Sequence, residues 1–285
     1  MISIKNLQKV YSNGVQAIRG IDLTVKEQFV HALLGPNGAG KTSTIKSILG
    51  LIKFEGEIKV LGENIDKVRD RIAFVPEEKS FYDYLTPRSS VNMCKRLFKN
   101  FDEKEAYRLL EYFEIPLNKK IKSFSNGMKT SVYLTLALAQ DVDLYIFDEP
   151  TTGLDPIKRS NLLELLRQKV IDGKTILYSS HIIPEVEKIA DYVSIMYKGK
   201  ILYSGFTDEI KEKFKVIYIP VDTLSKLEIN LQNFFSVMQE NEVVLLLSNE
   251  EKQWEEMMEI EDAEVKDVNL EEFFNVLIRG YDNVY

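Results

Sequence analysis

Residues 35–43 read Gly35-Pro36-Asn37-Gly38-Ala39-Gly40-Lys41-Thr42-Ser43. This run fits the pattern G-x-x-x-x-G-K-[ST], in which a glycine-rich turn lets backbone N–H groups close around phosphate oxygens. An apolar run from Phe29 to Leu34 precedes it and a helical pattern follows towards Leu51, so the turn opens a helix whose N-terminus favours an anion. We expect Lys41 to reach the β- and γ-phosphates of a nucleotide and the Thr42 hydroxyl to bind Mg²⁺.

A pair of carboxylates supplies the second half of the predicted site. The apolar run from Leu144 to Phe147 ends in Asp148 and Glu149. A buried strand of this kind places its last residues at the carboxyl edge of an open α/β sheet, where ligands bind. We expect Asp148 to hold Mg²⁺ through the water shell of the ion, and Glu149 to orient or deprotonate the attacking water. Phosphoryl transfer depends mostly on positioning and charge neutralisation, so one base and one metal ion are sufficient.

Three shorter motifs complete an ordered set. They read Phe124-Ser125-Asn126-Gly127-Met128 at a predicted helix start, Pro150-Thr-Thr-Gly-Leu154-Asp155 directly after the carboxylates, and Ser180-His181 at the end of the next predicted strand. In this order and spacing, and together with the phosphate loop, they resemble the signature loop, D-loop and switch histidine of the ATP-binding cassette (ABC) family. The resemblance covers residues 1 to about 205 and is greatest to the ATPases of ABC-2 type systems, many of which are exporters.

The resemblance implies a head-to-tail dimer that encloses two ATP molecules. A helix N-terminus that carries Ser125 and Gly127 is a second anion cradle, which would donate hydrogen bonds to the γ-phosphate held by a neighbouring subunit. His181 is expected to touch the γ-phosphate and Glu149. The expected nucleotide-binding residues are Tyr11 (stacked on adenine), Gly35, Pro36, Asn37, Gly38, Ala39, Gly40, Lys41, Thr42, Ser43, Ser125, Gly127 and Asp155 (at the seam between the chains), and the expected catalytic residues are Glu149, His181 and Lys41.

The sequence departs from the family pattern at several positions. Glu77-Glu78 follow Phe74-Val75-Pro76, where the family places a glutamine. We expect Glu77 to face the Mg²⁺ together with Thr42 and Asp148, but as an anion rather than a neutral amide. Ser131 lies near the position of an expected arginine after the signature loop, and Gln28-Phe29 stand where a glycine and an acidic pair often precede the phosphate-loop strand.

Composition and charge limit the classes of function. The chain has 285 residues, a net charge of -7 and a sequence pI near 5.2, so it lacks the basic footprint of a nucleic-acid-binding protein. Its single cysteine, Cys94, excludes an internal disulfide and fits a reducing compartment. Residues 1–5 lack the apolar core of a signal peptide, and no apolar run approaches the ~20 residues that span a bilayer. We therefore expect a cytoplasmic protein that binds the inner face of the cell membrane through an integral membrane permease.

The order of predicted elements indicates a cassette followed by a smaller domain. We expect an α/β fold of the P-loop NTPase type, with a mixed-sheet core, an antiparallel β subdomain, a helical subdomain at about 78–140, and a C-terminal α+β accessory domain. The predicted bounds are 1–207 for the nucleotide-binding domain and 208–285 for the accessory domain. Asn269 and Glu272 resemble a capping box at the start of the last helix. Trp254, Met257 and Met258 are spaced as a core stripe of a helix, and we expect His31 to be structural.

The leading hypothesis is an ATP-binding and ATP-hydrolysing subunit that drives a separate membrane permease, with export favoured over import. One alternative is a non-transport soluble ABC ATPase, which the single cassette and the absence of CxxC and basic patches disfavour. Another is a regulatory ATP-binding module with little turnover, which the presence of both Glu149 and His181 disfavours. The aromatic segment Ser80 to Leu85 is either the socket for the permease or a cover of the helical core. Homodimer and heterodimer both remain open.

Overall fold

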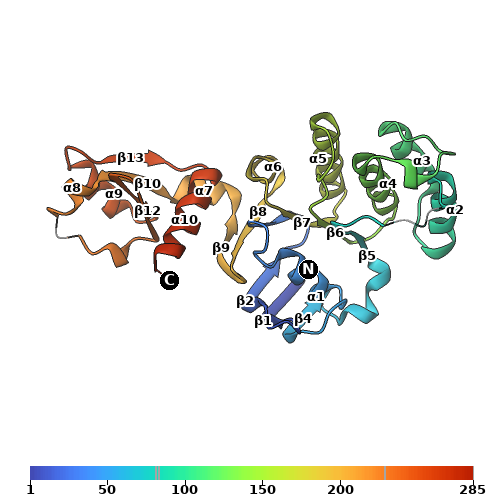
Figure 1. Ribbon diagram of the computed structural model, residues 1–285, viewed down its shortest axis with the longest axis horizontal. Helices are drawn as coiled ribbons and strands as arrows, with labels where there is room; N and C mark the ends of the chain where they lie inside the picture. Colours follow the sequence, from blue (N-terminus) through green and yellow to red (C-terminus); the bar gives the residue numbers. More distant parts are fainter. Residues whose placement is uncertain (81, 83, 228, 285) are drawn as a thin grey trace. The chain divides into compact units, whose positions relative to one another are not determined.

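The computed structural model describes residues 1–80, 82, 84–227 and 229–284. The chain divides into two compact units (Figure 1). The cassette unit comprises Met1–Ala190 and Met196–Ile201, and the C-terminal unit comprises Asp191–Ile195 and Leu202–Tyr285. The domain boundary expected between residues 207 and 208 stays a prediction.

A mixed sheet carries the predicted motifs. Within the described residues its strand order is β5-β6-β7-β3-β8-β9, with β5, β6, β7 and β3 parallel to one another. Every residue of β3, β6 and β7 is buried, which explains why β3 and β6 read as nearly continuous apolar runs rather than as alternating ones. Their carboxyl ends meet at one edge, where the phosphate loop, the carboxylate pair and His181 follow. The bounds are β3 Val30–Leu34, β5 Ile72–Val75, β6 Leu144–Asp148, β7 Thr175–Ser180, β8 Tyr192–Tyr197 and β9 Lys200–Phe206.

An antiparallel sheet of order β2-β1-β4 packs its alternating apolar residues on the first helix, α1. The bounds are β1 Ile2–Val10, β2 Gln16–Val25, β4 Glu55–Val60 and α1 Lys41–Ile48. The turn between β2 and β3 places Gln28 at a φ of 61°, in the left-handed region that glycine adopts most easily. The Gln28 N–H donates to Thr175 Oγ1 at 2.8 Å, and this bond anchors the turn to β7.

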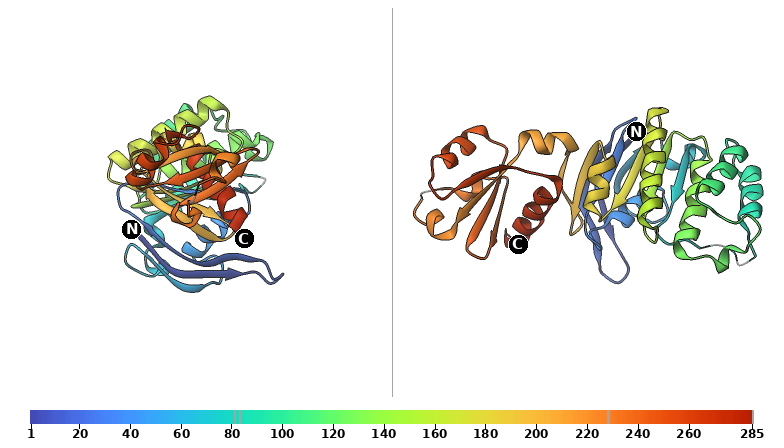
Figure 2. Two further views of the ribbon diagram at one scale, coloured as in Figure 1. Left: turned by 90° about the vertical axis from the view of Figure 1, so that its left-hand side faces the viewer. Right: turned by 90° about the horizontal axis from the view of Figure 1, so that it is seen from above.

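The helical part of the cassette unit has its own core. Helices α2 (Pro87–Leu97), α3 (Glu103–Tyr112) and α4 (Asn126–Leu138) gather at one end of this unit in Figures 1 and 2. Leu109, Leu110 and Phe113 are fully buried, and Leu110 and Phe113 belong to the core that these helices share. Burial also raises the pKa of the Cys94 thiol to about 11, so this cysteine is packing rather than chemistry. The remaining elements of the unit are α5 Pro156–Ile171, α6 Ile183–Ile189 and the 3₁₀ turns Ile65–Lys67, Arg69–Arg71 and Ile121–Ser123.

The C-terminal unit is an antiparallel sheet of order β11-β12-β10-β13 with helices packed on it. A Cβ on Gly280 would lie 2.1 Å from Ser236 Oγ, so glycine is what lets α10 approach β11 this closely. The bounds are β10 Lys215–Pro220, β11 Ser236–Glu240, β12 Val243–Ser248, β13 Glu264–Asp267, α7 Thr207–Lys213, α8 Val221–Leu224, α9 Glu251–Met258, α10 Leu270–Val284 and a 3₁₀ turn at Leu231–Asn233.

Two local predictions for this unit hold only in part. Asn269 accepts from the Glu272 N–H at 2.8 Å, as a helix cap should, but the Glu272 carboxylate accepts a hydrogen bond from the Tyr218 hydroxyl and so is used elsewhere. Met257 is 5% exposed and lies in the core, whereas Met258 is 62% exposed. The apolar stripe of α9 is therefore narrower than its sequence indicates. Across the described ranges, no helix combines the length and the apolar character that crossing a membrane requires.

Candidate active site

The phosphate loop owes its shape to two close approaches of backbone to backbone. A Cβ on Gly35 would lie 2.2 Å from the Met196 carbonyl oxygen, and one on Gly40 would lie 2.6 Å from the Ala17 carbonyl oxygen. Gly40 also has a φ of 112°, which side-chain-bearing residues rarely adopt. Helix α1 begins directly after it at Lys41, so the N-terminal N–H groups of the helix are left for a ligand.

A cavity of about 500 Å³ lies against this loop. Thr42 and Ser43 line it, as do the carboxylates Glu77 and Glu149 from two other segments. The site therefore joins a row of N–H donors and a lysine to acidic side chains, which is the donor set that a Mg²⁺-bound triphosphate needs. The remaining lining residues are Val15, Gln16, Ala17, Arg19, Asn37, Gly38, Ala39, Gly40, Lys41, Lys198 and Gly199.

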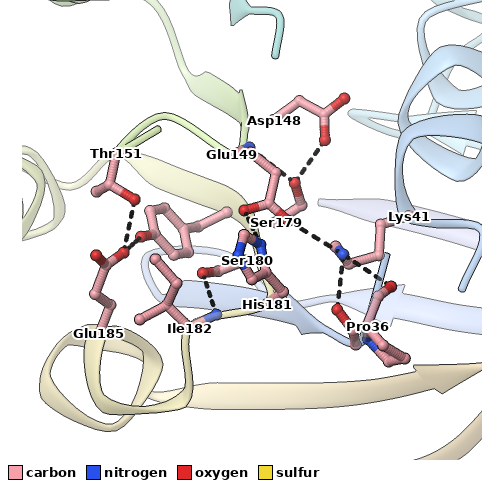
Figure 3. Close-up of polar contacts among 12 residues, drawn as sticks. Pro36, Lys41, Asp148, Glu149, Thr151, Ser179, Ser180, His181, Ile182 and Glu185 are labelled. Carbon is pink, nitrogen blue, oxygen red and sulfur yellow. Dashed lines mark hydrogen bonds and ion pairs between the residues drawn. The ribbon is translucent and has the colours of Figure 1, made fainter. Parts of the chain in front are cut away.

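Lys41 lies buried between the loop backbone and Glu149. Its Nζ donates to the Gly35 and Pro36 carbonyl oxygens at 2.7 and 3.3 Å, and lies 3.1 Å from Glu149 Oε1 (Figure 3). The contact between Lys41 and Glu149 is an ion pair by distance rather than a hydrogen bond. Among the described residues, Glu149 Oε1 has no hydrogen-bond partner of suitable geometry. A buried acceptor in this state is ready to bind an additional donor, such as a water molecule.

Ser179, which the sequence analysis did not identify, holds the Asp148 carboxylate and the backbone of Glu149. Its hydroxyl donates to Asp148 Oδ1 at 2.6 Å and accepts from the Glu149 N–H at 3.1 Å. Glu149 itself has a φ of 47°, a left-handed conformation that costs on the order of 1–3 kcal/mol for a side-chain-bearing residue. The signal for Ser179 is the parallel register, which pairs Asp148 with Ser179 across β6 and β7.

The histidine after β7 reaches the same carboxylate. His181 Nδ1 lies 2.8 Å from Glu149 Oε2, on the side opposite Lys41 (Figure 3). The Ser180 hydroxyl accepts from the Ile182 N–H at 2.9 Å and thereby fixes the turn that aims His181. The structure thus brings Lys41, Glu149 and His181 together in one line of contacts.

Glu77 is exposed at the rim of the cavity and has a cation beside it. The ammonium of Lys79, a residue that the sequence analysis did not name, donates to the Glu77 carbonyl oxygen at 2.9 Å. Burial lowers the pKa of Lys79, and the carboxylates of Glu77, Asp148 and Glu149 act in the opposite direction. The excess negative charge that Glu77 brings to the site is therefore partly balanced within the chain.

The expected metal ligands are consistent with Mg²⁺ but not with a preformed metal cage. Among the described residues no group of three or more His, Cys, Asp or Glu is placed to hold an ion. Mg²⁺ is commonly held by one or two carboxylates together with phosphate and water, and Thr42, Asp148 and Glu77 can supply that share.

The other expected nucleotide contacts lie outside this cavity in the described part of the chain. Ser125 caps α4, with its Oγ 3.3 Å from the Met128 N, and Asp155 caps α5, with its Oδ1 2.9 Å from the Lys158 N. Tyr11 Oη lies 3.0 Å from Ser43 Oγ, so the ring sits next to the loop rather than in the cavity wall. The adenine role of Tyr11 and the roles of Ser125 and Asp155 in a second subunit stay predictions.

Gly127 has a structural role within its own chain. A Cβ there would lie 2.4 Å from the Gly153 carbonyl oxygen, which brings the signature helix against the loop that follows Glu149. Ser131, one turn on, is buried and donates to the Gly127 carbonyl oxygen at 3.1 Å. The small serine side chain is therefore accommodated inside the helix packing at this position.

Comparisons with known proteins agree with this geometry. Residues 18–152 match the family described as ABC transporter. The chain is 30% identical over 239 residues to the ABC transporter ATP-binding protein YtrB of Bacillus subtilis, covering 82% of this chain and 81% of that protein. It is 33% identical over 226 residues to an uncharacterized ABC transporter ATP-binding protein of Nostoc, covering 74% of this chain and 68% of the relative. The solved structure of an ATP-binding subunit of an ABC transporter superposes with a TM-score of 0.67 at 30% identity, over 74% of this chain and 92% of that one.

The fold and the site define an ATP-binding cassette. The chain belongs to the ABC transporter ATP-binding proteins. It is an ATPase subunit whose cofactors are ATP and Mg²⁺, and it works with a second ATP-binding subunit and a membrane permease. The predicted α/β cassette fold is confirmed.

Proposed function

We propose that this chain powers an exporter by closing on a second ATP-binding subunit around two ATP molecules and reopening after hydrolysis. The line of contacts Lys41–Glu149–His181 carries the proposal, because it places a phosphate-binding cation and a proton acceptor on one cavity. Relatives named for resistance and export support the direction of transport. They include the linearmycin resistance protein LnrL of Bacillus subtilis (34% identical) and a Nod factor export ATP-binding protein of Burkholderia orbicola (34% identical).

The polar side chains in and beside the cavity have proposed tasks in hydrolysis. Lys41 moves from Glu149 to the β- and γ-phosphates, because a phosphate carries more negative charge than one carboxylate. Glu149 is then free to take a proton from the attacking water, and His181 holds Oε2 of Glu149 in position. Mg²⁺ supplies neutralisation of the phosphate charge when bound, and Thr42, Asp148 and Glu77 are the residues we assign to it.

The second subunit supplies what the cavity lacks. Ser125 and Gly127 lie at the start of α4 and do not line the cavity of their own chain, as far as the described residues show. We propose that the partner's Ser125 and the partner's Gly127 close the γ-phosphate side, since a helix N-terminus favours that charge. Turnover then requires two chains.

An apolar pocket in the cassette unit is the proposed surface for the permease. The pocket has a volume of about 600 Å³ and lies between β5 and the helices α2 and α4. Tyr82 lines the pocket and is 68% exposed, and the ring of Tyr84, which is 69% exposed, stacks on it with the ring centroids 5.7 Å apart. Exposed aromatic rings beside an apolar pocket are typical of protein interfaces. Phe81 and Asp83 of the predicted aromatic segment lie outside the described residues. We infer that this surface holds the protein at the cytoplasmic face of the membrane.

Copurification with membranes tests the proposal. Tyr82→Ala with Leu97→Ser should lose the permease from gently solubilised membranes while ATP binding stays unchanged, because neither residue lines the phosphate cavity. The matched surface control is Ile157→Ser, which replaces an exposed apolar residue on α5. Retention of the permease by the double variant contradicts the assigned surface. Cells depleted of the chain should retain more of an exported toxic compound, whereas reduced uptake of compounds would indicate an importer.

A further inference from the structure

We infer that Glu185, on the helix that follows His181, is a positioning residue for ATP hydrolysis. Its carboxylate fixes the loop of residues 150–155 that follows Glu149, and it ties this loop to β7, the strand that leads to His181. The inference rests on the proposed roles of Glu149 and His181. Glu185 is 6% exposed and lies in α6, four residues after His181. Glu185 is not among the described residues that line the cavity, and the sequence analysis did not identify it.

One oxygen of Glu185 binds two segments of the site. Glu185 Oε2 accepts from the Thr151 hydroxyl at 2.8 Å and from the Tyr178 hydroxyl at 2.7 Å (Figure 3). Thr151 lies two residues after Glu149, and Tyr178 is the neighbour of Ser179, which holds Asp148 and the Glu149 N–H. Both donors are buried, and the pKa of the Tyr178 phenol is raised by burial and by the Glu185 charge. Hydrogen bonds to a buried carboxylate are among the stronger ones in proteins.

The second oxygen reaches the far end of the same loop. Arg159 Nη1 lies 3.4 Å from Glu185 Oε1, and Arg159 Nε donates to the Leu154 carbonyl oxygen at 3.1 Å. Glu185 therefore holds the loop at Thr151 directly and at Leu154 through Arg159. The charge of the carboxylate is compensated by a cation, as a buried charge requires.

The opposite side of the loop is held by the signature helix. Thr130 Oγ1 donates to the Thr152 carbonyl oxygen at 3.2 Å, and the Gly153 carbonyl oxygen packs against Gly127. The loop thus lies between α4 and the Glu185 contacts. A displacement of α4 when a second subunit binds will move residues 151–154, and Glu185 determines whether Glu149 and His181 move with them.

The backbone of Glu149 makes this placement sensitive. Its φ of 47° is unfavourable for a side-chain-bearing residue, so surrounding contacts must impose it. The loop begins at Pro150, directly after this residue, and Glu185 is the charged group that fixes the loop on the side of β7. Loss of Glu185 contacts should therefore misplace Glu149 without affecting the phosphate loop.

The test compares two buried tyrosines of neighbouring strands. Tyr178→Phe removes the hydroxyl that binds Glu185, whereas Tyr145→Phe removes one in β6 that binds the Gln140 carbonyl oxygen. Each variant loses the hydrogen bond that its phenol hydroxyl donates, so Tyr145→Phe controls for the loss of stability that follows from removing such a bond. We expect Tyr178→Phe, Thr151→Val and Glu185→Gln to lower kcat about tenfold with an unchanged KM for ATP, and Thr151→Ser and Tyr145→Phe to keep kcat within about twofold.

A second measurement does not depend on turnover. Amide hydrogen exchange of residues 149–155 in the nucleotide-free protein should be faster in Thr151→Val and Tyr178→Phe than in the parent, and unchanged in Tyr145→Phe. If the parent itself does not hydrolyse ATP, the proposed function fails while the exchange result still decides on Glu185. Equal exchange in Tyr178→Phe and Tyr145→Phe would overturn the inference, as would equal loss of kcat in both.

Discussion

At the scale of single residues, the contact between Lys41 and Glu149 defines the resting state of the site. Each group neutralises the other, with Nζ and Oε1 3.1 Å apart in a buried setting. Under the proposed mechanism, a nucleotide that binds Lys41 displaces the carboxylate, and hydrolysis uses that carboxylate once it is displaced. The two functions of the cavity compete for the same lysine.

Glu149→Gln should bind ADP more tightly than the parent chain does. The amide cannot form the ion pair, so Lys41 is available to the β-phosphate at no cost, and we expect about tenfold higher affinity. Titration calorimetry of the monomer checks this. The matched control is Glu164→Gln, which changes an exposed residue on α5. If Glu149→Gln bound ADP no more tightly than this control, Glu149 and the nucleotide would not compete for Lys41.

Glu77 should determine how much Mg²⁺ the ATPase needs. Glu77→Gln restores the amide of the usual family pattern but removes a negative charge at the cavity rim. We expect the Mg²⁺ concentration for half-maximal turnover to rise about tenfold, the lower end of what loss of an outer partner costs a metal site. Glu78→Gln changes the adjacent exposed carboxylate and should have no such effect. Identical Mg²⁺ curves for the two variants would remove Glu77 from the metal site.

At the scale of elements, β3 carries a buried histidine that affects acid stability. Burial lowers the pKa of His31 from 6.5 to about 3, with the Lys26 charge as a smaller cause. The neutral form therefore supports the fold above about pH 6.5, and this stability is lost as the pH falls towards 3, because the unfolded chain takes up the proton first.

His31→Gln should flatten the pH dependence of unfolding. Relative to the parent, the variant should gain about 2 kcal/mol in the free energy of unfolding between pH 6.5 and pH 5, which is 1.5 pKa units at 1.36 kcal/mol each. Urea denaturation at a series of pH values measures this difference. Parallel curves for parent and variant over that range would show that His31 is not the group responsible.

The turn before β3 offers a change that should stabilise the fold. Gln28 has a φ of 61°, so Gln28→Gly should raise the free energy of unfolding by roughly 1 kcal/mol, the strain of a left-handed side-chain-bearing residue. Gln16→Gly, in the extended conformation of β2, should lower it by about 0.5–1 kcal/mol. Urea denaturation at neutral pH measures the free energy of unfolding of both variants and of the parent. If Gln28→Gly were less stable than the parent, the Gln28 side chain would make a contact that stabilises the fold by more than the backbone strain costs.

Elements with a clear hydrophobic pattern could be predicted from the sequence. Elements that form only because they pair with another strand or pack on another helix could not. The apolar runs Phe29 to Leu34 and Leu144 to Phe147 coincide to within one residue with the buried strands β3 and β6, because a continuous apolar run marks a strand that is covered on both faces. Strand β11 was not predicted, because Ser236 to Glu240 shows no such period and is defined by its pairing with β12 and its contact with Gly280. In the site, motif residues such as Lys41 could be identified, whereas Ser179 and Glu185 could not, because register and tertiary contacts select them.

At the scale of the whole molecule, we propose that the cassette is half of a working site. The cavity that contains Lys41 and Glu149 is lined without Ser125, Gly127 or Asp155 in the described part of the chain. Ligand binding to the closed dimer supplies the driving force, since a nucleotide at a hundred times its Kd favours the state that binds it by about 2.7 kcal/mol per site.

The dependence of ATP turnover on protein concentration tests this most directly. Specific activity of the purified chain should rise with concentration and follow the fraction of dimer measured by light scattering on the same samples, because in the proposed mechanism each γ-phosphate needs donors from two chains. Glu149→Gln should form the ATP-dependent dimer without turnover. Specific activity that stays constant down to concentrations at which only monomers are detected would contradict the account.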